Sequence, residues 1–541
     1  MQGLDPYLLN AIIFAPLIGA FVLLFLPPRW ENAIRRGAVL FSFIPLAASA
    51  YLIREFALEG NPQAASERFT LLRPWIRSFI NVDYAVYVDG LSLPLVALTA
   101  LLTTLVLLYS SNIKERVKEY YILFLLLEVG MLGTFLAIDF FLFYVFWEIS
   151  LVPMYFIIGV WGGERREYAA IKFFLYTLVG SIAMLLSLLW IYFTTKTSTF
   201  VFVDVPQLHG PSLAQMVPQA AANAARVGSI LPALAWWGIF LAFAIKVPTW
   251  PFHTWLPDAH VEAPTGGSVI LAGILLKMGG YGMLRILLPL MPEQSQQFAW
   301  VLIVMAVMGV VYGALVAMAQ WDLKKLIAYS SVNHMGYVMM GIAAVAAVSP
   351  AHAASVGLDL DAAARTAQTA ASGAVYVMMA HGFITSALFF LVGIIYDRTH
   401  TRDLAAFGGL NARLPVYSGF FRFFFFASLG LPLLAGFIGE FLAFVGTFPL
   451  FPWMTAIAAL GLIITAAFLL WTIQRVLLGP PQDRWAKLTD MDTREWVALL
   501  PLALLTIFFG VWPMPILNGL APFLDHLTNV FKGAASVMAG F

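Results

Sequence analysis

The segment Phe243-Ala244-Ile245-Lys246-Val247-Pro248 places a lysine at the end of an apolar run, with a proline two residues later. Proline removes a helical hydrogen bond and clashes with the preceding turn, so the helix must break just beyond Lys246. A second break is predicted in the stretch from Gly430-Leu431-Pro432 to Gly439-Glu440, again beside an ionisable residue. Two broken helices, one in each half of a chain, are typical of inverted-repeat transporters that handle ions near the membrane midplane. An ordinary proline kink is the alternative for either segment alone.

The composition supports a membrane protein. The chain has 541 residues, of which 11% are charged and 61% hydrophobic, whereas soluble proteins have about 25% and about 45–50%. Thirty basic and 29 acidic residues leave a formal charge of +1, which excludes a basic field for nucleic acid. Cysteine is absent, which excludes thiolate-bound iron–sulfur clusters and zinc. No dinucleotide or ATP-binding glycine motif occurs, so we expect this chain to bind no cofactor.

The hydrophobic blocks predict an all-α polytopic membrane protein with about 14 transmembrane helices, at about 20 apolar residues per crossing. The apolar run after Pro6 lacks the basic start of a signal peptide and is expected to be retained as a span. The predicted spans are Leu8–Leu26, Ala38–Ile53, Leu91–Tyr109, Tyr120–Ala137, Phe140–Val160, Ile171–Phe193, Ile230–Ile245, Val269–Leu290, Ala299–Ala319, Leu326–Val348, Ala374–Ile395, Pro415–Phe444, Met454–Leu478 and Val497–Val511. The tail after Val511 is expected to be too short to span and then run far along the surface.

The distribution of basic residues among the loops predicts the orientation of the chain in the membrane. Most loop lysines and arginines, such as Arg35, Lys114 and Arg402, follow odd-numbered spans. The positive-inside rule therefore places these loops in the cytoplasm and both termini outside it. The predicted location is the bacterial cytoplasmic (inner) membrane. The longer loops fall on the outer side, and we assign them no chemistry.

Several ionisable residues lie inside the predicted spans, where a charge costs about 2.5–3.5 kcal/mol even on the more lenient scale. We interpret them as a pathway for protons or ions, and the alternative is buried pairs that only fix helix packing. Histidines could relay protons because their pKa is near 6.5, although a hydrogen-bonded core histidine is equally expected. The ionisable residues inside the predicted spans are Glu128, Glu148, Lys172, Lys246, Lys277, His334, His381 and Glu440, and His253 and His260 are expected to line the cytoplasmic mouth.

A glutamate–lysine pair that can separate would act as a switch. An adjacent carboxylate favours a charged lysine, whereas dry surroundings favour release of its proton. The separation of His253 and His260 does not match a two-histidine helical metal face, so we predict no metal site.

Four stretches resemble the antiporter-like membrane subunits of respiratory complex I, most closely the M-type subunits of bacterial NADH–quinone oxidoreductase. They are Phe146–Phe156, Lys246–Lys277, Gly430–Glu440 and, more widely shared, Ala319–Ser331. The resemblance implies two inverted five-helix repeats. Residues 1–115 would hold helices 1–3, residues 116–290 the first repeat (helices 4–8), residues 291–480 the second inverted repeat (helices 9–13), and residues 481–541 helix 14 and the tail.

The resemblance also implies residue roles in proton translocation. Glu148 would pair with Lys246, Lys277 would continue the route inward through His381, and Glu440 would face the exit. Glu128, His334 and His253 are candidate relays. The L-type subunits differ because they carry a lysine at the position of Glu440 and add a long lateral helix.

The implied function is proton pumping from the cytoplasm to the outside, coupled to NADH oxidation and quinone reduction in other subunits. FMN, iron–sulfur clusters and quinone would be bound by those partners. The expected partners are L-type, N-type and smaller membrane subunits, through them the peripheral arm, and lipids. Two alternatives remain, a subunit of a multi-subunit cation/proton antiporter and a subunit of an energy-converting hydrogenase. The proteins that copurify would distinguish them.

Overall fold

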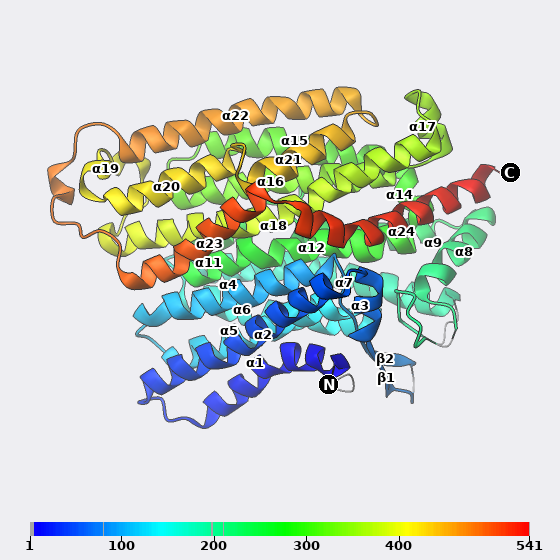
Figure 1. The fold of residues 1–541 in the computed structure, drawn as a ribbon, viewed down its shortest axis with the longest axis horizontal. Helices are drawn as coiled ribbons and strands as arrows, with labels where there is room; N and C mark the ends of the chain where they lie inside the picture. Colours follow the sequence, from blue (N-terminus) through cyan, green and yellow to red (C-terminus); the bar gives the residue numbers. More distant parts are fainter. Residues whose placement is uncertain (1–4, 79, 196–198, 209, 540–541) are drawn as a thin grey trace.

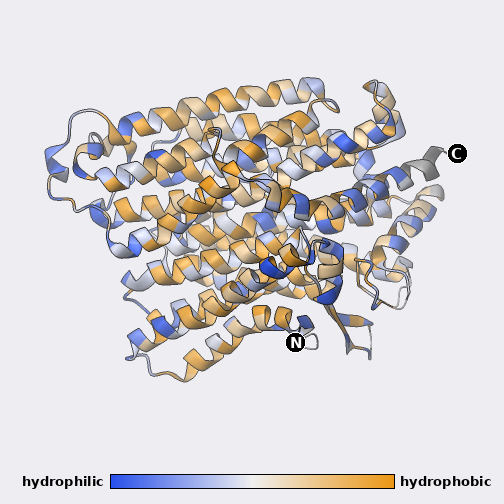
Figure 2. Cartoon of the chain, in the orientation of Figure 1, coloured by the Kyte–Doolittle hydropathy of each residue, from blue (hydrophilic) through white to orange (hydrophobic). Residues whose placement is uncertain are grey.

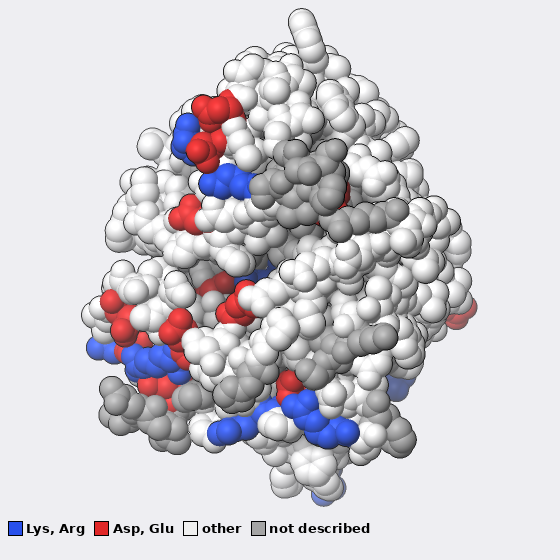
Figure 3. Space-filling model, turned by 90° about the vertical axis from the view of Figure 1, so that its right-hand side faces the viewer, with Lys and Arg blue, Asp and Glu red and all other residues white. Residues whose placement is uncertain are grey.

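The protein folds into a bundle of long, nearly parallel helices, as the computed structural model shows (Figure 1). The structure describes residues 5–539 except 79, 196–198 and 209. Apolar residues cover the flanks of the bundle, and polar residues concentrate toward its two ends (Figure 2). We call the end with the hairpin of β1 (Leu71–Ile76) and β2 (Val82–Val86) the hairpin end. The opposite end, which holds α19 (Leu410–Arg413), is called the α19 end. Charged side chains of both signs gather in separate clusters at the hairpin end (Figure 3).

Residues 5–112 contain three long helices and a small hairpin. Helix α1 packs against α2 and α5, and α2 packs against α4. Strands β1 and β2 pair antiparallel, with Leu71 opposite Val86 and an irregularity between Pro74 and Ile76. The elements are α1 (Leu8–Phe25), α2 (Glu31–Glu59), α3 (Pro62–Arg68), β1 (Leu71–Ile76), β2 (Val82–Val86) and α4 (Ser92–Tyr109), with 3-10 turns η1 (Asp5–Tyr7) and η2 (Ser110–Asn112).

The next group of helices contains the first break. Helices α5, α6, α7 and α9 pack in sequence. After α10, the helical segment from Thr265 to Leu290 is interrupted by two π-helical turns. The elements are α5 (Val117–Leu136), α6 (Phe140–Trp161), α7 (Arg166–Thr195), α8 (Leu213–Arg226), α9 (Leu231–Lys246), α10 (Trp255–Glu262), α11 (Thr265–Ile270), π-turn η3 (Leu271–Leu275), α12 (Leu276–Gly282), π-turn η4 (Met283–Leu287), α13 (Leu288–Leu290) and α14 (Pro292–Gln297).

The last group surrounds α18, which contacts α16, α21, α23 and α24. The elements are α15 (Ala299–Met318), α16 (Leu323–Ala346), α17 (Pro350–Ser355), α18 (Leu360–Thr399), η5 (Leu404–Ala406), α19 (Leu410–Arg413), α20 (Pro415–Ser428), α21 (Ala435–Thr447), α22 (Pro452–Leu477), η6 (Asp483–Trp485), α23 (Thr493–Val511) and α24 (Met514–Ala539).

The predicted helical membrane fold is confirmed. Among the described residues, 11 helices are long and apolar enough to cross a membrane, and α9 and α21 are shorter apolar helices. All the predicted apolar blocks fall on helices. Helix α7 exposes Leu175, Val179, Ile182 and Leu186 at helical spacing, as expected for a face in contact with lipid tails. The count of 14 crossings, the repeats and the residue ranges assigned to them stay predictions.

Three regions differ from the sequence expectations. Residues 71–86 form a hairpin, so the fold is not purely helical. The segment between α7 and α9 contains α8. The tail after Val511, for which no helix was predicted, forms α24, a 26-residue helix that packs against α18. Proline at its second position is compatible with the start of a helix, and the buried side chains of Leu520 and Phe531 dock this helix on the bundle.

Both predicted helix breaks are present. Helix α9 ends at Lys246, and the chain resumes as α10 at Trp255. The indole N–H of Trp255 donates to the Ile245 carbonyl at 2.9 Å, which satisfies an acceptor that the break frees. Helix α20 ends at Ser428, and α21 begins at Ala435. Each break therefore lies directly beside a buried polar site.

Candidate functional site

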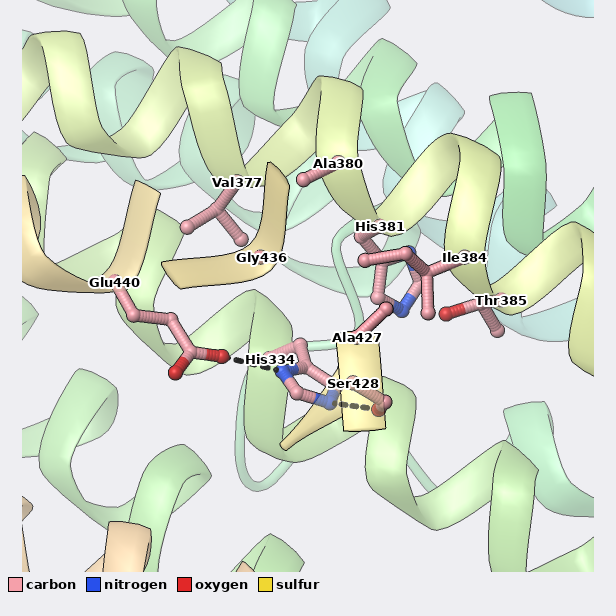
Figure 4. Close-up of a pocket in the computed structure, with 10 residues that line it drawn as sticks. All are labelled: His334, Val377, Ala380, His381, Ile384, Thr385, Ala427, Ser428, Gly436 and Glu440. Atoms are coloured by element: carbon pink, nitrogen blue, oxygen red, sulfur yellow. Dashed lines mark hydrogen bonds and ion pairs between the residues drawn. The ribbon is translucent and has the colours of Figure 1, made fainter. Parts of the chain in front are cut away.

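A row of four ionisable side chains crosses the centre of the bundle. Lys277 of α12, His381 of α18, His334 of α16 and Glu440 of α21 are all nearly or fully buried. Three of them appear in the close-up of Figure 4, where His334 lies between the other two. These four positions come from helices that are far apart in sequence, so only the tertiary packing brings them together.

Lys277 begins the row. Its ammonium lies 2.5 Å from Nδ1 of His381 and donates to the carbonyl of Ala272, which lies in η3. A π-turn shifts the hydrogen-bonding register of a helix, and such turns are frequent at functional sites. The register shift therefore helps to give a fully buried lysine a backbone acceptor five residues before it.

His334 lies in the middle of the row. Its Nδ1 is 3.1 Å from Oε1 of Glu440, and its Nε2 is 3.0 Å from Oγ of Ser428. Ser428 is the last residue of α20, so it reaches His334 because the helix ends there. From the sequence, His334 is predicted only as a candidate relay, and the predicted route leads from His381 toward Glu440. In the structure His334 bridges the space between them.

Glu440 lies against the second break. Gly430 has φ +79°, and a Cβ there would lie 2.9 Å from Oε2 of Glu440. Glycine is suited to this left-handed conformation because it has no Cβ. The break therefore brings bare backbone close to the carboxylate.

A small cavity joins the two histidines. Their ring centroids are 5.7 Å apart, and Nε2 of His381 is buried without a hydrogen-bond partner in the described structure. The cavity is lined by His334, His381, Ser428 and Glu440 among others and has a volume of about 10 Å³. That is about the space one water molecule requires, so a water could complete the row.

The side chains of Glu148 and Lys246, which were predicted to pair, do not form an ion pair in the structure. Glu148 and Lys246 are close enough for their charges to interact, but no ion pair within 4.0 Å joins these two described residues. The ammonium of Lys246 instead lies 4.9 Å from the ring centroid of Trp147, and the Trp147 indole donates to Ser181 at 3.0 Å. The aromatic face supplies a cation–π contact in place of the carboxylate. The expected closed pair is thus open in this structure.

The remaining candidates lie outside the row. Glu128 is fully buried between α2, α4 and α5 and accepts from Ser42 at 3.1 Å. His253 packs near Tyr312, and both of its ring nitrogens are buried without partners in the described structure. Neither contacts the four-residue row, so the structure does not place them as links within it.

His260 is predicted from the sequence only to line the cytoplasmic mouth. It is fully buried and stacks on Phe389 of α18, with ring centroids 4.5 Å apart. Its charge would interact with those of Lys277 and Lys324. The position of His260 soon after a helix break indicates a candidate functional residue. Its packing against α18 depends on the tertiary structure and could not be predicted from the sequence.

Larger cavities lie toward both ends of the bundle. At the α19 end, a cavity of about 650 Å³ is lined by Glu262, Lys324 and Arg402 among others. Toward the hairpin end, a cavity of about 360 Å³ reaches Asp89 and Arg285, whose side chains form a buried ion pair at 2.5 Å. In the described part of the chain, no cluster of three or more histidine, aspartate or glutamate residues could hold a metal ion.

Two broken helices that flank a buried row of lysine, histidines and glutamate define an antiporter-like helical membrane protein. A family model described as NADH:quinone oxidoreductase/Mrp antiporter, transmembrane, matches residues 137–358 and 349–465. The chain belongs to this family, which confirms the resemblance seen in its motifs.

Individual relatives match the chain over nearly its full length. NADH-quinone oxidoreductase subunit M of Rhodobacter capsulatus is 40% identical over 98% of both chains. Subunit M of Rickettsia prowazekii is 41% identical over 95% of this chain and 97% of its own. A chain of respiratory complex I from Thermus thermophilus with bound NADH matches with a TM-score of 0.81 and 29% identity, over 97% of this chain and 99% of that chain.

Proposed function

We propose that this chain is the proton-translocating M-type membrane subunit of an NADH–quinone oxidoreductase. The observation that carries the proposal is the buried row from Lys277 through His381 and His334 to Glu440. It is supported by relatives named subunit M that cover nearly the whole chain. NADH oxidation and quinone reduction would occur in partner subunits, which would hold the FMN, the iron–sulfur clusters and the quinone.

The first step in this proposal is a change in the Glu148–Lys246 pair. Lys246 shares its surroundings with Trp147, so its ammonium can lie over the indole or approach the carboxylate. When the pair closes, the carboxylate stabilises the lysine's proton, and when it opens the buried ammonium is destabilised. Redox energy from the partners would drive this alternation and so control the charge near Lys277.

The second step moves a proton along the row. Lys277 would release its proton to Nδ1 of His381, which lies within hydrogen-bond distance. His381 would pass a proton through one water to His334, and His334 would pass it to Glu440. Imidazole suits this role because one ring nitrogen can accept a proton while the other gives one up. Such titrations belong to the coupled row and not to one residue.

The direction of transport follows from the loops. We propose that the α19 end faces the cytoplasm, because loops rich in lysine and arginine lie there, and that both termini lie outside. The cavity lined by Glu262 and Lys324 would then admit cytoplasmic protons. Glu440 would release them toward the outer side.

NADH-driven acidification of inverted membrane vesicles tests the function. The vesicles should acidify inside on adding NADH, independently of sodium, and a protonophore should abolish the gradient. Glu148→Gln should leave assembly intact and largely stop this acidification. Normal acidification by Glu148→Gln vesicles that hold normal amounts of the complex would refute the proposed role of Glu148.

A cation/proton antiporter is the second candidate, because the matching family model also describes Mrp antiporters. Purification of the assembled complex separates the two. Copurification of NADH-oxidising flavin and iron–sulfur subunits supports the oxidoreductase, and copurification of antiporter subunits alone would support the second candidate.

A further inference from the structure

A basic residue with an unusual environment lies at the α19 end of α22, far from the proton row. The guanidinium carbon of Arg475 is 3.6 Å from the ring centroid of Trp471 and 4.1 Å from that of Trp321. The two indole rings are 5.7 Å apart and inclined by 71°, so they form a corner that holds the guanidinium. We call these three residues the Arg475 corner.

The Arg475 guanidinium has no acceptor among the residues that the structure describes. Within the described chain, no carboxylate lies within 4.0 Å of its nitrogens and no hydrogen bond to it is found. The acidic neighbour of Trp321, Asp322, is already paired with Arg402 at 3.2 Å. Asp322 also accepts from the backbone N–H groups of Lys324 and Lys325. The donors of Arg475 are therefore held in place but remain free for an external acceptor.

Arg484 shows the contrast. It also lies over an indole, with its guanidinium carbon 4.9 Å from the Trp485 ring centroid. Its nitrogens, however, donate to Oε1 of Gln482 at 2.7 Å and to the carbonyl of Ala406. An arginine in a cation–π contact can therefore still have protein acceptors for its N–H groups. Arg475 differs from Arg484 because its N–H groups have no such acceptor among the described residues.

The corner lies where an apolar flank meets a polar loop. Helix α22 runs along the edge of the bundle (Figure 1), and it exposes Ile463 and Leu470 along its length. Trp321 and Leu478 are also about half exposed, at 51% and 48%. Tryptophan is enriched at the level of lipid headgroups, and an apolar surface directly beside the corner can contact an acyl chain.

We propose that the Arg475 corner binds the phosphate of an anionic phospholipid in the membrane leaflet at the α19 end. The planar fork of arginine donates two parallel hydrogen bonds to phosphate oxygens, and the two indoles fix its orientation. The acyl chains would extend from the corner toward the membrane interior, along the exposed apolar face of α22 that includes Leu470 and Ile463. A free phosphate ion shares the headgroup chemistry but not these apolar contacts. This site is independent of the proton row.

Photolabelling tests the site on the assembled complex. The purified complex is reconstituted in phosphatidylcholine vesicles with a trace of phosphatidylglycerol that carries a diazirine in its headgroup. After illumination, labelled peptides are mapped by mass spectrometry. We expect label on the peptide spanning Trp471–Leu478. Arg475→Gln should lower its yield about tenfold, equivalent to about 1.4 kcal/mol of binding free energy, and Arg484→Gln should leave it unchanged.

Each other result would contradict the proposal. Equal labelling of Arg475→Gln and the wild type would show that Arg475 binds no headgroup. An equal loss of labelling in Arg475→Gln and Arg484→Gln would show that basic residues attract the anionic lipid only through their charge, without a specific site. Loss of label on adding excess inorganic phosphate would assign the site to the free ion. If Arg475→Gln does not assemble, Arg475→Lys replaces it, because lysine keeps the charge but loses the planar fork; labelling must then fall, and wild-type labelling would overturn the proposal.

Discussion

Nδ1 of His334 lies 3.1 Å from Oε1 of Glu440, and the opposite nitrogen of the same ring lies 3.0 Å from Oγ of Ser428. The imidazole is thus fixed between a carboxylate on α21 and the end of α20. Both neighbours belong to the second broken helix. The break and the histidine together form a single hydrogen-bonded unit, which we propose binds the transported proton.

Replacing His334 tests that unit. His334→Gln keeps a similar size and hydrogen-bonding capacity but removes the titrating ring. A positioned acid–base group contributes about 10²- to 10⁴-fold to a proton transfer, so we expect NADH-driven acidification to slow by at least about tenfold. The matched control is His352→Gln, since the His352 ring is partly buried, hydrogen-bonds to the carbonyl of Leu450 at 2.9 Å and has no proposed role in proton transfer. Equal effects of the two substitutions would contradict a special role for His334.

Gly430 offers a second test, directed at the break. Gly430→Ala forces a side chain into a left-handed conformation, which costs about 1–2 kcal/mol, and places Cβ against the carboxylate of Glu440. We expect a lower temperature of thermal inactivation and slower pumping. Gly419→Ala is the control, because a Cβ at Gly419 has open space within α20 and alanine favours a helix by about 0.8–1.0 kcal/mol. If Gly430→Ala behaves like the control, the conformation at the break is unimportant.

Part of this site could be predicted from the sequence. Pro248 and Pro432 marked the two breaks because proline cannot continue a helix, and a charge in an apolar span marked Lys277 and Glu440 as candidates. The contact between Lys277 and His381 could not be predicted, because it depends on how α12 and α18 rotate and pack. The central position of His334 could not be predicted either, because it depends on how α16, α20 and α21 pack together.

The open state of the Glu148–Lys246 pair had no sequence signal either. A resemblance can indicate that two residues form a pair, but not whether the pair is closed in a given structure. Trp147, adjacent to Glu148 in the chain, provides the alternative contact for Lys246. The hairpin and α24 were missed for a different reason, since their segments lack the long apolar runs that identify membrane helices.

The ion pair between Arg398 and Glu495 should be important for stability. Two hydrogen bonds of 2.6 Å and 2.8 Å join the side chains, and Glu495 is fully buried. Breaking a buried pair costs about 3–5 kcal/mol. Glu495→Gln should therefore reduce the amount of assembled complex, measured by immunoblot of membranes. Glu119→Gln removes a pair with Arg116 that is exposed on both sides and should change little; an equal loss would contradict this account.

The Asp139 carboxyl predicts a pH dependence of stability. Asp139 lies between α5 and α6, accepts from the backbone N–H groups of Phe141 and Leu142, and borders the Asp83–Arg77 ion pair. Burial raises the pKa of Asp139 from 3.8 to about 7. A raised pKa means that the folded protein binds more protons than the unfolded chain, so this contribution to stability falls as the pH rises from about 4 to about 7.

Asp139→Asn checks this contribution, since asparagine can still cap the helix but does not titrate. The temperature of thermal inactivation, measured from pH 4 to pH 8, should fall less steeply with rising pH in the variant than in the wild type. Parallel curves would show that Asp139 does not titrate in this range.

The most direct test of the proton row is the number of protons transported per NADH oxidised by inverted vesicles carrying Glu440→Gln. Glutamine keeps the shape of the side chain but cannot take up and release the proton that His334 would pass on. With normal amounts of assembled complex, we predict a marked fall in this ratio. The rate at which the peripheral arm oxidises NADH with an added artificial electron acceptor should stay normal. A wild-type ratio at a wild-type rate would contradict the conclusion that the row ending at Glu440 carries protons.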